Sequence, residues 1–486
     1  MIEKLLDIGE KIVKQAEKLG ADESEAYLYV ENLTLARYVG GIVATRGGAL
    51  KGVKAPFFRL MEPWIKRKGI TFMKNGVKAG VGIRTVINKS VGFTSISSIE
   101  EETVLKAVEE AIHIARIRPP DPNWKSLPDP KKLTAKGGIF DQRIADIDPA
   151  QILSLAAEGC VSSADFDKRI SQAISLIQTA TVHLGIVNSR GIEVGDKGTA
   201  FAGSCVTKAK VGSEEVSGEE PIFSRQFVEN LSEIGTCASR RTIECLGSKH
   251  LEEKLSGPVV FENTTFGELF ELMLGTSISA LNVQEERSRF KGKIGEQVAN
   301  EDFTIIDDGT LPEGFNTRIS DDEGIPRQKT PVIEKGTLKS FLYDNYSAKR
   351  EGRESTGNAN RRAILLGPAP FAVQPRVGLS NLVLEPRKGS LQDLIAGVQD
   401  GILVKGSMMG VLHSNFVTGD FSVTATNVFR IKNGQIAYPL KPCSVAGNFH
   451  ESLKSIIAIG SDSRCGGYAG DVICPSIVVD KLTVSA

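Results

Sequence analysis

Apolar residues in the first part of the chain follow two different periods. Residues 2–19 place leucine, isoleucine and valine at helical spacing, which predicts an amphipathic helix. The pattern of residues 24–39 predicts a strand, and residues 76–97 predict paired strands joined by an Asn-Lys turn. Helical spacing returns over residues 98–117. Residues 1–117 are therefore expected to form an α+β domain.

Residues 118–132 contain five prolines and no apolar period, which indicates a linker. Beyond it, residues 149–166 predict a helix, and alternating β-branched residues around an Asn-Ser-Arg-Gly turn predict a hairpin. These elements give a central α+β domain, residues 133–250. Residues 257–486 are rich in strand-forming residues and glycine, and are expected to form a strand-rich C-terminal domain. The expected fold class is α+β, with an α/β-type N-terminal region.

Residues 47–73 have no clean period and carry several basic residues together with Pro56 and Pro63. They predict a loop insertion in the N-terminal domain. A lid or contact arm and a surface excursion without function are equally compatible with such a segment.

The chain of 486 residues carries 59 Lys and Arg against 59 Asp and Glu, with no long run of either sign. This balance gives no electrostatic reason to expect a nucleic acid or an anionic membrane as a partner. No apolar stretch approaches the roughly 18 residues that span a bilayer, and the first positions lack the apolar core of a signal peptide. Seven scattered cysteines suit a reducing compartment. A cytoplasmic protein of several domains is expected.

The histidines are too far apart in the sequence for a short zinc motif. No two of the five lie within one helical turn or loop of each other, and no HExxH pair occurs. Their positions are His113, His183, His250, His413 and His450. The residues alone favour a chain without its own metal, and a site assembled from distant ligands is the alternative.

Cys465 lies in the Gly-rich stretch SRCGGYAG, where a turn would expose a thiol. A reactive cysteine needs a neighbouring histidine or helix N-terminus to lower its pKa, which the sequence alone does not supply. A free, unreactive Cys465 is the favoured interpretation, and a nucleophilic one is the alternative. Neither a G-x-S-x-G elbow nor a phosphate-binding loop occurs.

Residues 264–283 have the pattern of a half-buried helix. Thr265 and Glu268 are spaced as a capping box, and apolar residues recur on one face. This part of the chain resembles the TldD/PmbA family, because PVVFENTTFGELFELMLG at 258–275 keeps the frame around the zinc helix of its catalytic subunits.

The resemblance implies which residues are missing. Catalytic family members carry an HExxxH zinc helix, and the corresponding positions here are Phe270-Glu271-Leu272-Met273-Leu274-Gly275. Phe270 and Gly275 stand where the two histidines are expected, and Glu271 matches the catalytic glutamate. A lone glutamate can neither hold zinc nor use a zinc-bound water. The resemblance therefore implies a chain with no catalytic residue and no metal of its own.

Two downstream stretches carry the resemblance further. Residues 303–362 follow the family's DDEG and STGN signatures, and residues 418–449 resemble the TldE/PmbA type, which is the partner subunit. Residues 463–476 instead echo the end of the catalytic subunit, whose cysteine contributes to the zinc site. Cys465 would be that ligand, and with both histidines absent it is interpreted as a remnant or a coincidence.

The resemblance implies a non-catalytic, peptide-guiding partner subunit of a two-subunit cytoplasmic metalloprotease. Zinc is expected in a TldD-like catalytic subunit that forms a heterodimer with this chain, and a homodimer is a second arrangement. The expected substrates are unfolded or extended peptides, with no nucleic acid and no membrane as partner. Two other functions stay open: an autonomous hydrolase that uses Cys465 or a non-standard metal site, and a non-enzymatic regulator linked to DNA gyrase.

The family signatures also suggest where a peptide would bind. The DDEG loop and the STGN segment are expected near the cleft, which selects Asp322, Glu323, Asn358, Asn360 and Arg361 as candidate lining residues. The alternative is local turn chemistry, because Asp and Asn often precede Gly in left-handed geometry. The two interpretations differ in location, since a functional set should converge on one concave surface.

Overall fold

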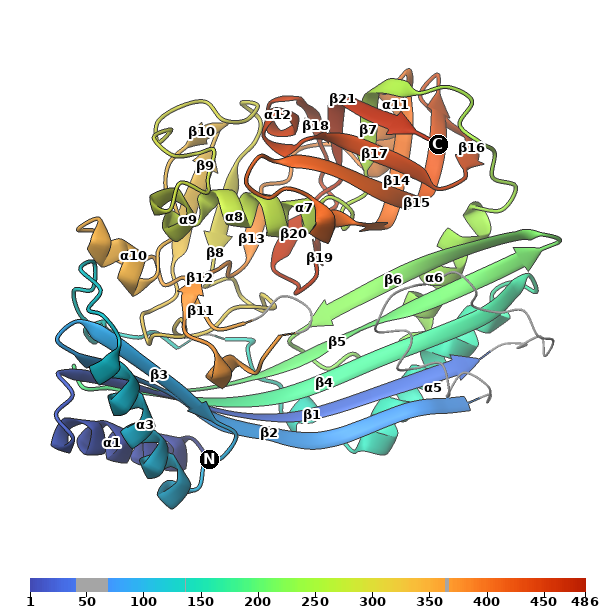
Figure 1. The fold of residues 1–486 in the computed structure, drawn as a ribbon. Coiled ribbons are helices and arrows are strands. Elements are labelled where there is room, and N and C mark those ends of the chain that lie inside the picture. The colour runs from blue at the N-terminus through green and yellow to red at the C-terminus, as the bar shows by residue number, and fades with distance from the viewer. Residues whose placement is uncertain (41–68, 136, 363–366) are drawn as a thin grey trace.

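The computed structural model describes residues 1–40, 69–135, 137–362 and 367–486. Its N-terminal part is built on one antiparallel sheet of six strands in the order β3-β2-β1-β4-β5-β6 (Figure 1). The strands are β1 (Glu23–Gly40), β2 (Gly69–Ile87), β3 (Ser90–Ile96), β4 (Ile170–Asn188), β5 (Glu193–Val211) and β6 (Glu214–Ser224). Strands from both sides of residues 118–132 join this sheet, so the predicted N-terminal and central domains share one layer.

The predicted hairpins are confirmed, and turn residues explain their geometry. Asn88 and Lys89 join β2 to β3 with φ values of 50° and 65°, the left-handed pair that a two-residue type I′ turn requires. β4 and β5 pair along almost their whole length. The side-chain oxygen of Asn188 closes the turn between them by accepting hydrogen bonds from the backbone N–H groups of Arg190 and Ile192.

Helices cover one face of this sheet (Figure 1). They are α1 (Ile2–Lys18), α3 (Glu101–Ile117), α4 (Gln142–Ala145), α5 (Pro149–Asp165) and α6 (Ser232–Glu244), and the three helices predicted here are confirmed. The α3 backbone approaches so closely that a Cβ on Gly92 of β3 would lie 2.0 Å from the Ala111 carbonyl oxygen. No helix in the described ranges is long and apolar enough to cross a membrane.

Alternation along β1 gives the two faces of the sheet different partners. Ala26 and Leu28 pack in the core beneath α1 and α3. Tyr27 and Tyr29 point to the other face, where they join a cluster with Phe371 of the C-terminal domain. The face opposite the helices is therefore the surface on which the C-terminal domain rests.

The C-terminal domain contains a closed barrel and a second sheet. β14 pairs with both β7 and β15, which closes the ring β14-β7-β21-β17-β15, and β16 and β18 extend it. The second sheet has the order β10-β9-β8-β13-β20-β19, and β11 pairs with β12. The α+β class with a strand-rich C-terminal domain is confirmed. The strands are β7 (Leu255–Phe261), β8 (Ile305–Asp308), β9 (Lys329–Glu334), β10 (Thr337–Leu338), β11 (Ala359–Asn360), β12 (Arg376–Val377), β13 (Leu382–Leu384), β14 (Asp400–Met409), β15 (Asp420–Lys432), β16 (Gln435–Leu440), β17 (Cys443–Asn448), β18 (Ile456–Ile459), β19 (Arg464–Gly466), β20 (Val472–Cys474) and β21 (Ile477–Ser485).

The helix predicted at residues 264–283 is present, but it begins at Gly267 and is buried rather than half-buried. It consists of α7 (Gly267–Leu269), the π-helix η2 (Phe270–Leu274) and α8 (Gly275–Ile278), which follow one another without a break, and of α9 (Ala280–Gln284). Every residue of η2 is buried, because the barrel and the second sheet enclose it, and no side chain caps the start of α7. The other short helices are α10 (Asn345–Arg350), η3 (Pro370–Ala372), α11 (Leu391–Ala396), η4 (Val411–His413) and α12 (Phe449–Lys454).

Residues 118–132 are held along the boundary between the sheet and the C-terminal domain. Trp124 is buried, and its Nε1–H donates a hydrogen bond to Glu23 of β1 at 3.1 Å. The Tyr346 hydroxyl of α10 donates to Asp121 at 2.8 Å. The proline-rich segment is therefore packed on both sides.

Most of the predicted insertion at 47–73 lies outside the described residues. Its last five residues, 69–73, belong to β2 and not to a loop. They pair with residues 36–39 of β1, so the sheet includes the last residues of the predicted insertion.

Candidate functional site

Phe270 occupies the position of the first expected histidine as a core side chain. Its ring is fully buried and lies 5.0 Å from Phe266, 5.8 Å from Phe303 and 6.1 Å from Phe449, measured between ring centroids. Gly275 occupies the second position, and a Cβ added there would lie 3.3 Å from a leucine side chain. Both positions thus face apolar atoms and offer no ligand atom.

Glu271, at the position of the catalytic glutamate, is held by the backbone of a turn. Its Oε2 accepts hydrogen bonds from the N–H groups of Tyr468 at 2.6 Å and Ala469 at 3.4 Å. Its Oε1 has no hydrogen-bond partner among the described residues. Burial, reinforced by the nearby Asp471 carboxylate, raises the pKa of Glu271 to about 8. The carboxyl group is therefore mainly protonated at neutral pH.

Replacing Glu271 with Gln is expected to flatten the pH dependence of stability. Folding raises the pKa of this carboxyl from 4.5 to about 8. Its contribution to stability is therefore fully present below pH 4.5 and is lost as the pH rises from 4.5 through 8. Between pH 5 and 9, calorimetry should show the native chain losing on the order of 2–4 kcal/mol more than Glu271→Gln. Glu253→Gln, at an exposed position, is the control and should behave like the native chain. A parallel pH profile for Glu271→Gln would contradict the neutral carboxyl.

Cys465 lies on β19 near the same turn, but its thiol is not activated. Its Sγ donates to the Gly470 carbonyl at 3.5 Å, and no imidazole bonds to it in the described part of the chain. Burial, with a contribution from Asp471, raises the pKa of Cys465 to about 12. The buried histidine of this domain, His450, instead shares a hydrogen bond with Ser277 at 3.0 Å. These contacts disfavour a nucleophilic Cys465.

The residues around Glu271 do not fit a zinc ion. Arg362 and Asp471 form an ion pair at 2.8 Å in its vicinity, and Arg362 Nη1 also donates to Asn316 at 2.6 Å. A guanidinium repels a second cation, and Phe270 and Gly275 supply no ligand atom beside Glu271. Within the described ranges, no three His, Cys, Asp or Glu side chains gather as a metal site.

The five predicted cleft residues lie near one another but do not share one surface. Asp322 and Asn360 line a cavity. Glu323, Asn358 and Arg361 are instead buried, each with 1% of its surface exposed. The predicted set is therefore split: Glu323 and Arg361 contact the sheet, whereas Asn358 bonds to Asp307 within the C-terminal domain.

The buried charges join the sheet to the C-terminal domain. Arg84 of β2 donates to Glu25 of β1 at 2.6 Å and to Glu323 of the DDEG loop at 2.8 Å. Arg361, which follows the STGN segment, forms an ion pair with the second oxygen of Glu25. Each domain contributes one arginine and one glutamate. Glu323 in the DDEG loop and Arg361 after the STGN segment thus join the C-terminal domain to the sheet through ion pairs.

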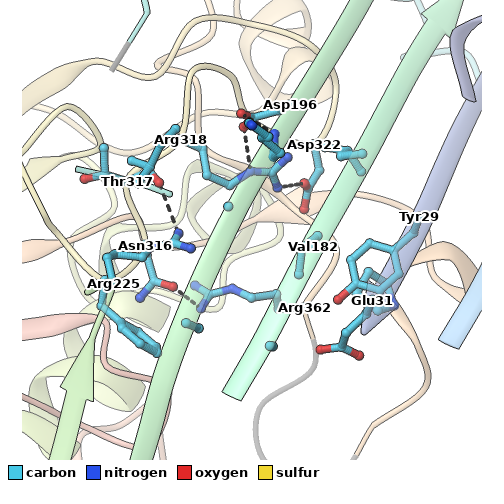
Figure 2. Close-up of a pocket in the computed structure, with 18 of the residues that line it drawn as sticks. Tyr29, Glu31, Val182, Asp196, Arg225, Asn316, Thr317, Arg318, Asp322 and Arg362 are labelled. Atoms are coloured by element: carbon cyan, nitrogen blue, oxygen red, sulfur yellow. Dashed lines mark hydrogen bonds and ion pairs between the residues drawn. The ribbon is translucent and has the colours of Figure 1, made fainter. Parts of the chain in front are cut away.

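A cavity of about 310 Å³ lies between the sheet and the C-terminal domain (Figure 2). One wall comes from β1, β4 and β5, on the face of the sheet opposite the helices. The other wall comes from loops of the C-terminal domain and from the segment after β6. Arg318 lies between the walls, with its guanidinium 2.7 Å from Asp322 and 3.4 Å from Asp196 of β5. The walls therefore combine apolar strand residues with paired charges.

Sequence reasoning missed the arginines of this cavity. Arg318 lies three residues before Asp321, the first residue of the DDEG loop, Arg362 directly follows Arg361, and Arg225 follows β6. Arg318 and Arg362 lie next to motifs that the sequence analysis recognised, so their position beside those motifs could have identified them as candidate cleft residues. Arg225 has no motif beside it, and only the fold brings it to the cavity.

Three family models match successive parts of the chain. Domain 1 of the PmbA/TldA metallopeptidases matches residues 65–115, the central domain residues 142–246 and the C-terminal domain residues 254–486. A metalloprotease TldD homologue of Buchnera aphidicola is 32% identical over 468 residues, which cover 87% of this chain and 90% of that protein. The chain belongs to the PmbA/TldD family. The family identified from the sequence motifs is thereby confirmed.

Other PmbA/TldD proteins resemble the chain over nearly its full length. A metalloprotease PmbA homologue of Haemophilus influenzae is 26% identical over 481 residues, covering 96% of this chain and 99% of that protein. The crystal structure of TldE from Thermococcus kodakarensis is 25% identical with a TM-score of 0.83, and the match covers 99% and 100% of the two chains. The sheet, barrel and second sheet described above are therefore the PmbA/TldD fold.

Proposed function

We propose that this PmbA/TldD protein is a non-catalytic, peptide-guiding subunit of a cytoplasmic two-subunit metalloprotease. The observation that carries the proposal is the aromatic core around Phe270, which fills the place of a zinc ligand. Glu271 is held neutral by burial, and Arg362 places a positive charge near it. These residues supply no ligand set for a metal, and without a metal there is no bound water of lowered pKa for Glu271 to use.

The catalytic zinc then belongs to a TldD-like subunit that forms a heterodimer with this chain. Relatives named for TldD and for TldE share this architecture, which supports pairing between two similar subunits. Unfolded or extended peptides are the proposed substrates. The balance of 59 basic and 59 acidic residues supports a peptide over a nucleic acid or an anionic membrane as partner. A homodimer is the second arrangement.

The test measures zinc and peptide hydrolysis on one preparation. After a chelator wash and reloading with zinc at neutral pH, the chain is expected to hold far less than one zinc and to leave an unstructured peptide intact. Adding a zinc-bearing TldD-like subunit from the same genome should start hydrolysis. Stoichiometric zinc in the reloaded chain, measured by elemental analysis, would overturn the proposal.

An autonomous hydrolase is the weaker candidate, because it requires an activated Cys465 or a non-standard metal site, and no three possible ligands gather within the described residues. The high pKa of that thiol and its carbonyl partner argue against a thiolate at neutral pH. The link to DNA gyrase stays a prediction, since no contact within the described residues bears on it.

A further inference from the structure

Arg225 lines the cavity and has no carboxylate partner among the described residues. Its Nη1 donates to the Thr199 carbonyl at 2.8 Å. Its Nη2 donates to the Thr317 carbonyl at 3.1 Å (Figure 2). Its Nε–H is buried and has no hydrogen-bond partner among the described residues. The Phe315 ring centroid lies 5.8 Å from the guanidinium carbon. Because a guanidinium offers five donor hydrogens, those of Arg225 are only partly used.

The charges around Arg225 favour an anion beside it. Burial and the neighbouring Arg318 and Arg362 lower the pKa of Arg225 to about 10, and the Asp196 carboxylate opposes this shift. Arg318 and Arg362 are both engaged in ion pairs with carboxylates. Arg225 is left with backbone carbonyls and a ring. An incoming negative charge would therefore relieve repulsion at Arg225 without competing against an existing ion pair.

The rest of the cavity suits one apolar side chain. On the sheet side, its wall includes Tyr29, Ala180, Val182 and Leu184. Figure 2 shows Val182 and Tyr29 on the strands that face the arginines. A volume of about 310 Å³ is near the lower limit for ligand pockets. It therefore suits the end of a chain better than a continuous strand.

We propose that this cavity binds the carboxyl-terminal residue of a peptide, with the carboxylate on Arg225 and an apolar side chain against Val182 and Tyr29. A guanidinium matches a carboxylate because it presents parallel N–H donors in a fixed fork. That the natural ligand is a peptide rests on the proposed function. The recognition of a carboxylate joined to an apolar group rests on the cavity alone.

Calorimetric titration of the full chain with two matched peptides tests the proposal. The probes are acetyl-Ala-Ala-Leu with a free carboxylate and the same peptide with a carboxyl-terminal amide. The acid is expected to bind saturably at neutral pH, and the amide at least about tenfold more weakly, because the charge-assisted hydrogen bonds are lost. Equal affinity of the two peptides, or no binding of the acid, would overturn the assignment.

Arg225→Met tests the residue, because it keeps the length of the side chain and removes its charge. Its affinity for the acid should fall at least about tenfold, to the level of the amide. Arg169→Met is the matched control, since Arg169 precedes β4, is 48% exposed and pairs with Asp167 at 2.7 Å. Unchanged affinity in Arg225→Met, with unfolding midpoints confirming a folded chain, would refute the role of Arg225.

Val182→Phe tests the cavity independently of Arg225. The larger side chain occupies the space and leaves the guanidinium in place, so binding of the acid should be lost even though the charge remains. Tight binding by a folded Val182→Phe chain would place the peptide elsewhere and overturn the proposal. Zinc in the native chain would overturn the proposed function without changing the difference between acid and amide, so the two failures are distinguishable.

Discussion

Arg361→Ala is expected to lower the free energy of unfolding by about 3–5 kcal/mol, the typical cost of removing one partner from a buried ion pair. The side chains of Arg361 and Glu25 are both 0% exposed. Arg361 also donates to the Val373 carbonyl at 2.8 Å, and its guanidinium carbon lies 4.5 Å from the Tyr27 ring centroid. Alanine removes all three contacts and leaves Glu25 with Arg84 as its remaining charged partner.

Calorimetric unfolding of three variants separates this effect from an ordinary loss of charge. Arg287→Ala is the matched control, because its side chain is 65% exposed and pairs with Glu285 at 3.2 Å. It should cost less than about 1 kcal/mol. Arg361→Lys should fall between the two, since lysine keeps the charge and loses the planar fork. Similar losses for Arg361→Ala and Arg287→Ala would contradict a buried connection between the domains.

The burial of Glu323 in the DDEG loop and of Arg361 after the STGN segment could not be predicted from the sequence. Charged side chains are rarely fully buried unless they are paired, and the pairing partners lie far away in the chain. Arg84 and Glu323 are 239 residues apart, and Glu25 and Arg361 are 336 residues apart. Neither distance leaves a local pattern. The motifs could be recognised, but their position between two layers could not.

The sequence predicts correctly those elements that depend on residues close together in the chain. The apolar stripe of residues 2–19 and the Asn88-Lys89 turn each depend on a few neighbouring residues, and both elements form where the sequence predicts them. The segment at 264–283 is helical as predicted, but it is buried rather than half-buried, because the barrel and the second sheet enclose it. The cavity beside Arg225 likewise exists only after distant loops meet the sheet.

Restoring the missing histidines is expected to damage the core without creating a zinc site. Phe270→His with Gly275→His recreates the HExxxH letters of the family. The first change removes a fully buried ring from the contacts with Phe266 and its neighbours and buries a polar imidazole. The second inserts a side chain where a Cβ would already lie 3.3 Å from a leucine. We expect the double variant to lose about 3 kcal/mol or more of unfolding free energy.

Unfolding midpoints measured with and without zinc show whether the double variant has gained a metal. A metal that binds only the folded chain raises the midpoint by mass action, and none is expected here because Arg362 remains near Glu271 and the imidazoles start inside an apolar cluster. Phe166→His is the control for the aromatic replacement, since Phe166 is 39% exposed. It should change stability by no more than about 0.5 kcal/mol. A zinc-dependent rise in the midpoint of the double variant would instead show that two side chains are enough to give this chain a zinc site.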